Sequence, residues 1–173
     1  MLTEKQEKWV QGLSIESIIS IVPFDESCHE KFERLKSFIQ SKLGRQQPVL
    51  HRGASNLCIS GQDEIDIHIP VPAKEFDNSI ILLSELFGTA RGYYPLERAR
   101  FNTTEEGKKI EIFLLNEESP EYIKGKKFHE YLIDNPEVLE QYRILKESGN
   151  GLTTQEYYRR KLEFMNVIYE KFD

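Results

Sequence analysis

The sequence predicts an α+β protein in which a small mixed β-sheet with flanking helices is followed by a helical C-terminal third. Three patterns support this fold class. Residues 64–69 alternate strictly between an acid or His and isoleucine, as in a strand with one buried face. Residues 32–43 carry apolar side chains at helical spacing. After about residue 118 only helical patterns follow, so strands and helices do not alternate as they do in a doubly wound sheet.

The first part of the chain is expected to supply two helices and the first strands. A short helix is expected over residues 3–12, and "ESIISIVPF" is expected to be extended. In "DESCHEKFERLKSFIQSKLG", Gly44 suits the end of a helix whose apolar face consists of Phe32, Leu35, Ile39 and Leu43. "QPVLHRG" and then "EIDIHIPV" are predicted to form strands.

After Pro72 the spacing of the apolar residues changes from every second residue to every third or fourth residue. The apolar face of the next predicted helix consists of Phe76, Ile80, Leu83 and Phe87, and Gly88 is its expected end. From about residue 91 to 116 the chain is again strand-like. The turn Thr104-Glu105-Glu106-Gly107 separates "RARFNT" from "KKIEIFLL", which predicts an antiparallel hairpin.

The last third is predicted to be helical, from about residue 118 onward. Ser119-Pro120 and Asn135-Pro136 each place a capping side chain ahead of a proline at the first helical position. Thr153 and Glu156 have the spacing of a capping box. Beyond them, the expected packing stripe consists of Tyr158, Leu162, Met165, Tyr169 and Phe172. No linker or repeat interrupts the chain, so residues 1–173 are expected to form a single domain.

The composition is that of an ordinary globular protein. A chain of 173 residues can bury a sizeable core, and its formal net charge of −6 makes long nucleic acid an unlikely partner. The two cysteines do not suggest a disulfide framework. The N-terminal residues "MLTEKQEKW" lack the apolar core of a signal peptide, and no apolar run approaches the length of a membrane span. We therefore expect a soluble, cytoplasmic protein with no membrane contact.

Two acids and a histidine share one face of the strand at residues 64–69. Successive strand side chains point to opposite faces, so Glu64, Asp66 and His68 lie together, opposite the isoleucines. Glu111 alternates with isoleucines in the same way and would join them if its strand lies alongside. Carboxylates are preferred ligands of Mg²⁺, so Glu64, Asp66 and Glu111, with His68, are predicted to bind Mg²⁺ or Mn²⁺. Without metal, such clustered acids are expected to repel one another.

A turn of small residues, Gly53-Ala54-Ser55, precedes this strand. Small residues let the backbone approach a phosphate closely, where N–H groups and a hydroxyl can bind it. The alternation itself has a plainer explanation, because any half-exposed sheet alternates polar and apolar residues. The spacing from the turn to the acid pair, together with a third acid on a later strand, favours a site.

This combination resembles the nucleotidyltransferase superfamily related to DNA polymerase β, and more closely the GrpB family, which is assigned to it. The matching segments are "IVPFDESCHEKFERL", "HRGAS", "FHEYLIDNPEVLEQYRILK" and "EYYRRKLEFMNVI", in the family's order and spacing. The last of them is similar to the family's closing Tyr-x-x-x-Lys-x-x-Phe helix, which gives Tyr157, Lys161 and Phe164. The resemblance covers the chain from about Ile19 to Phe172 and implies a sheet of the nucleotidyltransferase type.

The chain departs from the family pattern at the acids themselves. The family often has an apolar residue where Glu64 stands, and a His-x-His strand where Glu111 and Phe113 stand. Its Arg-Asp pair is replaced by His129-Glu130. These departures bring the chain closer to the three-acid pattern of the superfamily. They strengthen the metal hypothesis and weaken a transfer of any family substrate.

The resemblance and the residues together give one leading function and two alternatives. In the first, Glu64, Asp66 and Glu111 are catalytic and a nucleotidyl group moves from a nucleotide triphosphate to an unknown hydroxyl acceptor. Nucleotide binding is assigned to Gly53, Ala54, Ser55 and Lys161. The second function is a non-catalytic module that binds a nucleotide or a partner, and the third is a metal-dependent hydrolase. The family is sometimes fused to dephospho-coenzyme A kinase, which implies a link to coenzyme A synthesis.

Overall fold

The computed structural model describes residues 1–172, which divide into two compact units. The helical unit contains residues 1–23 and 60–62 together with the chain from Lys126 onward. The sheet unit contains residues 24–59 and 63–125. The prediction of a single domain is neither confirmed nor contradicted by this division, so each unit is described separately.

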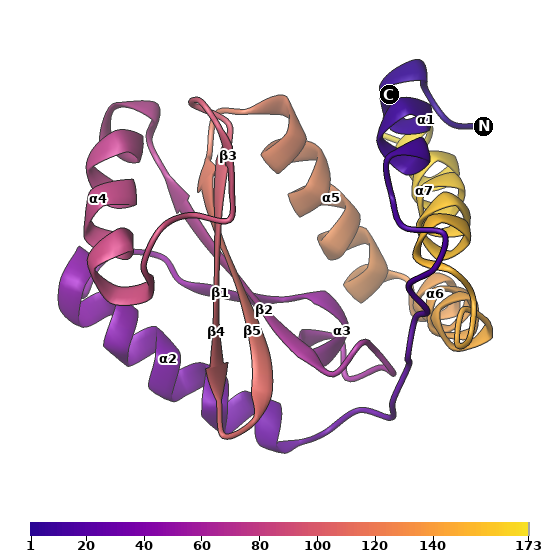
Figure 1. Cartoon of the computed structure of the whole chain (residues 1–173), viewed down its shortest axis with the longest axis horizontal. Helices are drawn as coiled ribbons and strands as arrows, with labels where there is room; N and C mark the ends of the chain where they lie inside the picture. The colour runs from indigo at the N-terminus through magenta and orange to yellow at the C-terminus, as the bar shows by residue number, and fades with distance from the viewer. Residues whose placement is uncertain (173) are drawn as a thin grey trace. The chain divides into compact units, whose positions relative to one another are not determined.

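A five-stranded mixed sheet forms the centre of the sheet unit (Figure 1). In the order β1-β2-β5-β4-β3, the strands are Leu50–Arg52, Glu64–Val71, Lys108–Asn116, Arg98–Glu105 and Gly92–Tyr94. β2 and β5 run parallel, while the other neighbouring strands are antiparallel. This sheet and the helices confirm the predicted α+β class, and the strands lie where the alternating patterns predicted them.

Two helices cover the apolar face of the sheet. α2 (Ser27–Leu43) and α4 (Phe76–Phe87) follow the two predicted helical patterns, and each is followed by a glycine with positive φ. Phe32 of α2, Phe76 of α4 and Ile67 of β2 belong to one hydrophobic core. The isoleucines of β2 are fully buried, so their alternation places the acids of the same strand on the opposite face.

The hairpin between β4 and β5 turns at Glu106 and Gly107, as predicted. Their φ angles are +49° and +79°, which suits the two-residue hairpin turn with both central residues in the left-handed region. Arg34 of α2 donates hydrogen bonds to Glu105 and Glu106 at 3.0 and 2.8 Å. Lys108 forms ion pairs with Asp25 and Asp63 at the other side of this turn. These contacts attach the start of β5 to its surroundings.

Four helices make up most of the remaining chain. They are α1 (Glu4–Gln11), α5 (Pro120–Asp134), which crosses from the sheet unit into the helical unit, α6 (Pro136–Ser148) and α7 (Thr154–Tyr169). Thr3 and Gln6 form a capping box at the start of α1. Within the helical unit, Arg159 of α7 binds both carboxylate oxygens of Glu7, at 2.8 and 2.6 Å. A paired fork of this kind fixes α1 against α7.

Two predicted helix caps differ in detail from the structure. Asn135 makes no capping hydrogen bond to α6 and instead donates from Nδ2 to the carbonyl of Tyr131, at 2.8 Å. Only one residue separates α5 from α6, so this amide satisfies a terminal carbonyl of the preceding helix instead. Thr153 does cap α7 through Glu156 N at 3.2 Å, but the Glu156 carboxylate pairs with Arg160, so the capping box is half formed.

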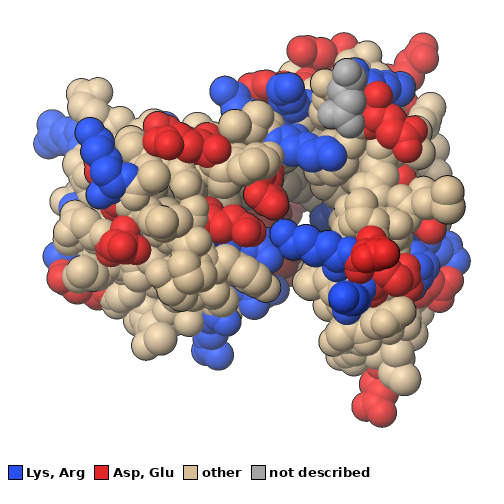
Figure 2. Space-filling model, turned by 90° about the horizontal axis from the view of Figure 1, so that it is seen from above, with Lys and Arg blue, Asp and Glu red and all other residues tan. Residues whose placement is uncertain are grey.

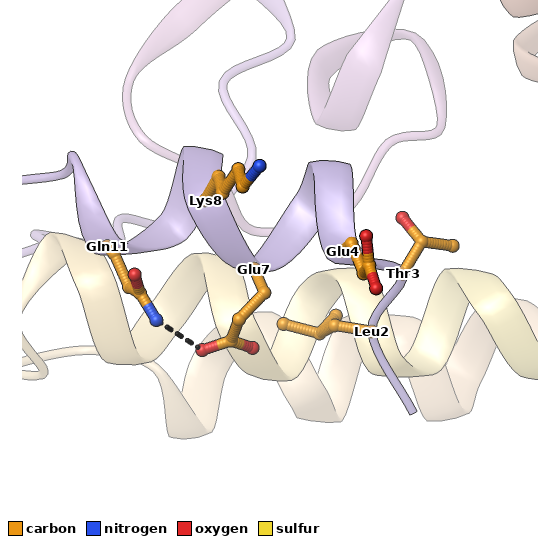
Figure 3. Close-up of a pocket in the computed structure, with 6 residues that line it drawn as sticks. All are labelled: Leu2, Thr3, Glu4, Glu7, Lys8 and Gln11. Carbon is orange, nitrogen blue, oxygen red and sulfur yellow. Dashed lines mark hydrogen bonds between the residues drawn. The ribbon is translucent and has the colours of Figure 1, made fainter.

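An open pocket lies along α1 in the helical unit (Figure 3). Its lining residues are Leu2, Thr3, Glu4, Glu7, Lys8 and Gln11. Gln11 donates a hydrogen bond to Glu7 there at 3.3 Å, and the Glu7 carboxylate is already bound by Arg159. None of the predicted site residues lines this pocket. No helix within residues 1–172 has the length and apolar character needed to cross a membrane.

Candidate functional site

The polar face of β2 and β5 brings together the acids that the sequence singled out. Asp66 and Glu111 are register partners on these parallel strands. Glu64 and Lys109 are register partners two residues earlier on each strand, and they lie on the same face. Ile65 and Ile67 pair with Ile110 and Ile112 on the opposite, buried face. The expectation that Glu111 joins Asp66 on neighbouring strands is therefore confirmed as geometry. Metal binding by these residues stays a prediction.

Glu111 is the most deeply buried acid of this face. The residue is 7% exposed, and its Oε1 accepts a close contact from Lys109 Nζ at 2.7 Å. Its other oxygen, Oε2, is buried without any hydrogen bond and lies 3.7 Å from Arg100 Nε. A buried carboxylate oxygen without a hydrogen-bond donor loses its hydration and gains little in return. Within the acid face, this oxygen is therefore the atom whose burial is least compensated.

Lys109 lies between two of the predicted metal ligands. Its ammonium is 2.7 Å from Glu111 Oε1 and 3.2 Å from Glu64 Oε2. Partial burial disfavours the charged form, but the hydrogen bond to Glu111 and the charge of Glu64 outweigh it and raise the pKa of Lys109. Lys109 therefore remains a cation at neutral pH and neutralises part of the acid face.

The Asp66 carboxylate packs directly against the small-residue turn. Gly53 begins α3 (Gly53–Asn56) with a φ of +71°, a conformation that glycine adopts without cost. A Cβ placed on Gly53 would lie 1.9 Å from Asp66 Oδ2. Asp66 also pairs in register with Arg52, the residue immediately before the turn. Glycine at this position is thus required both by the backbone angle and by the carboxylate beside it.

The Ser55 hydroxyl faces the core rather than the polar side of the sheet. Ser55 is buried, and its Oγ shares a hydrogen bond of 2.9 Å with His51 Nε2. The His51 ring is stacked on Phe32 with the centroids 4.7 Å apart. The Ser55 hydroxyl is therefore already engaged in a buried hydrogen bond on the core side of the sheet. The assignment of Gly53, Ala54 and Ser55 to nucleotide binding stays a prediction.

The remaining predicted residues, His68 and Lys161, belong to different units. His68 is on the same face, and its ring packs edge-on against Phe113 with the centroids 5.4 Å apart. Lys161 belongs to α7 in the helical unit, with its ammonium 5.5 Å from the centroid of the Tyr158 ring. Its assignment to nucleotide binding stays a prediction.

The donors of the polar face fit Mg²⁺ or Mn²⁺ in kind but are not gathered around a single point. Carboxylate oxygens from Glu64, Asp66 and Glu111 are the ligands that these hard ions prefer, and Glu111 Oε2 makes no hydrogen bond. Within residues 1–172, however, no group of three or more His, Cys, Asp or Glu side chains is arranged to hold an ion. Metal binding therefore requires these side chains to move.

Sequence reasoning missed the partners of the acids. Lys109 and Arg100 were not among the predicted site residues, yet both approach Glu111. Lys109 could have been placed from the sequence, because it lies two residues before Glu111 on the same face of a strand. On the surface drawn in Figure 2, basic and acidic side chains are likewise interspersed.

By its fold, the chain is an α+β protein with a mixed sheet. Two adjacent parallel strands of this sheet carry carboxylates beside a glycine turn. The family model described as GrpB protein matches residues 18–171, and the chain belongs to the GrpB family. Its fold is similar to that of the conserved protein GrpB from Enterococcus faecalis, with a TM-score of 0.67 and 16% sequence identity. That match covers 88% of this chain and 98% of the other. Comparison with curated proteins gave no significant match.

Proposed function

We propose that this protein is a metal-dependent nucleotidyltransferase that moves a nucleotidyl group from a nucleotide triphosphate to a hydroxyl acceptor. One observation carries the proposal. Asp66 and Glu111 are register partners on parallel strands, and Glu111 retains a buried oxygen without a hydrogen bond. A glycine turn that could accept a phosphate lies against Asp66. The resemblance to the nucleotidyltransferase superfamily supports the same function.

Each group on the polar face has a role in this reaction. Glu64, Asp66 and Glu111 would hold Mg²⁺ or Mn²⁺, with His68 as a further ligand, and the metal would neutralise charge on the phosphates. The backbone of the Gly53 turn would orient the triphosphate. The acceptor oxygen bonds to the α-phosphorus, the bond from that phosphorus to the bridging oxygen breaks, pyrophosphate leaves and the hydroxyl proton passes to water. Positioning and charge neutralisation account for the rate.

A second candidate function is a binding module that holds a nucleotide or another partner without chemistry. The observation that favours it is the pairing of Glu111 and Glu64 with Lys109, which satisfies acids that a catalytic site would offer to metal. In this case a nucleotide-like molecule would bind through the basic side chains and the turn. The link to coenzyme A synthesis implied by the family fits either function and names no substrate.

Calorimetry with Mn²⁺ and a nonhydrolysable nucleotide triphosphate separates the two functions. The wild type should bind the nucleotide more tightly when Mn²⁺ is present, and Asp66→Asn should lose that gain because one ligand oxygen becomes an amide. Asp77→Asn is the matched control, since Asp77 is an exposed acid on α4. Equal nucleotide binding by all three proteins, with or without metal, would favour the binding module. Release of pyrophosphate from a panel of nucleotides would then test for transfer.

A further inference from the structure

One of the two cysteines lies at the surface of the sheet unit beside a histidine. Cys58 is exposed and forms no disulfide, and its Sγ shares a hydrogen bond of 3.7 Å with Nε2 of His29, which is also exposed. His29 belongs to α2 and Cys58 follows α3, so the fold brings together two residues that are distant in the sequence. An imidazole beside a thiol is a pairing that activates cysteine nucleophiles in proteins.

Two aromatic contacts orient the His29 ring. It packs edge-on against Phe24 and against His51, with the ring centroids 5.6 Å apart in each case. His51 is itself buried and held by its hydrogen bond to Ser55. An activated nucleophile needs a base within reach and a further group that orients this base. His29 is the base within reach of Cys58, and the neighbouring rings orient it.

The charged side chains at this end of α2 have other partners. Asp25 pairs with Lys108, Lys31 pairs with Glu106, and Arg34 pairs with Glu30. Within the described residues, the other polar contact of Cys58 Sγ is the carbonyl oxygen of Asn56, at 3.8 Å. A backbone carbonyl accepts a hydrogen bond but does not take up a proton at neutral pH. His29 is therefore the group in contact with this thiol that can accept its proton.

We propose that Cys58 is a modification site at which this protein forms a mixed disulfide with a low-molecular-weight disulfide, with His29 as the base. The thiol proton passes to Nε2 of His29 while Sγ of Cys58 bonds to one sulfur of the small molecule. The S–S bond of the small molecule breaks, and the departing sulfur takes the proton from the imidazolium and leaves as a thiol. One thiol and one disulfide become one mixed disulfide and one thiol, so no further oxidant is needed. None of the acid-face residues takes part, so this chemistry does not depend on the proposed function.

The second cysteine provides an internal comparison. Cys28 is 3% exposed and belongs to the hydrophobic core. Burial raises the pKa of its thiol, which disfavours the thiolate that attacks a disulfide. We therefore expect a small disulfide to react with Cys58 and not with Cys28 while the protein is folded.

Reaction with oxidised glutathione, followed by intact-mass spectrometry, tests the pair. The proteins are the wild type, Cys58→Ser, His29→Gln and His29→Asn, with Glu33→Gln as the control because Glu33 is an exposed residue elsewhere on α2. An unassisted thiol is only about 1% ionised at about pH 6.5. At this pH the His29 variants should react about five- to tenfold more slowly than the wild type, since a larger share of thiolate is partly offset by its lower nucleophilicity.

At about pH 9 the rates of the wild type and the His29 variants should converge, because a thiol is then ionised without a base. Cys58→Ser should gain no adduct, and Glu33→Gln should match the wild type. Equal rates at the lower pH would overturn the role of His29, and so would a loss of rate that is the same at both pH values. A first adduct on Cys28, located by peptide mass, would overturn the assignment of the site. Circular dichroism identifies a variant that has lost its fold, in which case the other substitution at His29 carries the comparison.

Discussion

Replacing Gly53 with alanine is expected to disturb both the turn and the carboxylate beside it. Gly53 has a φ of +71°, and a Cβ at this position would lie 1.9 Å from Oδ2, 2.9 Å from Cγ and 3.2 Å from Cβ of Asp66. Rotating the carboxylate alone does not relieve the contacts with Cγ and Cβ. Asp66 must therefore leave its place, or the turn must shift.

The size of the effect follows from these two costs. A left-handed backbone costs an alanine about 1–2 kcal/mol relative to glycine. Displacing a half-buried carboxylate from its hydrogen-bonding place costs about 1–3 kcal/mol. The smaller freedom of the unfolded chain offsets about 0.4–1 kcal/mol of this. We expect Gly53→Ala to lower the free energy of unfolding by about 1–5 kcal/mol.

A double-mutant cycle with Asp66→Ala separates the two costs. With the carboxylate removed, Gly53→Ala should cost only about 1 kcal/mol, because the backbone strain remains and the collision does not. Urea denaturation followed by far-ultraviolet circular dichroism gives the four free energies. The same loss in both backgrounds would show that Asp66 does not occupy the space over Gly53, and a loss below about 0.5 kcal/mol in the wild type would refute the strained turn as well.

Three further changes test other parts of the chain. The hydrogen bonds of Asp25 with Ser27 and with Lys108 lower the pKa of Asp25. The ionised carboxylate therefore stabilises the fold above its unfolded-state pKa of about 4, and this stabilisation is lost as the pH falls below that pKa. Lys108→Met should make stability depend less on pH in the acid range, and an unchanged pH dependence would contradict this. Lys146 is 6% exposed and has no carboxylate partner within residues 1–172; its ammonium donates a hydrogen bond to the Tyr157 hydroxyl. Lys146→Met should leave the free energy of unfolding unchanged or raise it by about 1 kcal/mol, because a buried charge is removed. A clear loss of stability in thermal melts would show that the hydrogen bond to Tyr157 matters more. In the same melts, Mn²⁺ with triphosphate should stabilise the wild type but not Asp66→Asn.

Local patterns were sufficient to predict the elements and the faces of the sheet. The isoleucines of β2 are buried as their alternation indicated, and α2 and α4 begin and end near the predicted residues. The parallel pairing of β2 with β5 was only a condition in the sequence argument, because neighbouring strands depend on contacts between residues far apart in the chain. Because β2 and β5 are neighbours, acids that are far apart in the sequence lie on one face of the sheet.

Side-chain partners were harder to predict than elements. The hydroxyl of Ser55, whose assignment to nucleotide binding stays a prediction, shares a hydrogen bond with His51 that the sequence did not indicate. Asn135 was expected to cap α6, yet its amide serves the helix before it. In both cases the residue type and its place near a helix or turn could be predicted, while packing decided which neighbouring donor or acceptor the side chain contacts. Such choices leave no periodic trace in a sequence.

The balance of charge on the polar face decides what kind of ligand it can take. Clustered acids were expected to repel one another, but Glu111 and Glu64 are matched by Lys109 and Arg100. The register partner of Asp66 on the neighbouring strand β1 is a further basic residue, Arg52. A divalent cation added to a face that is already balanced brings an excess of positive charge. A metal accompanied by phosphates brings none, so the electrostatics of this face favour a metal–triphosphate complex over a free ion.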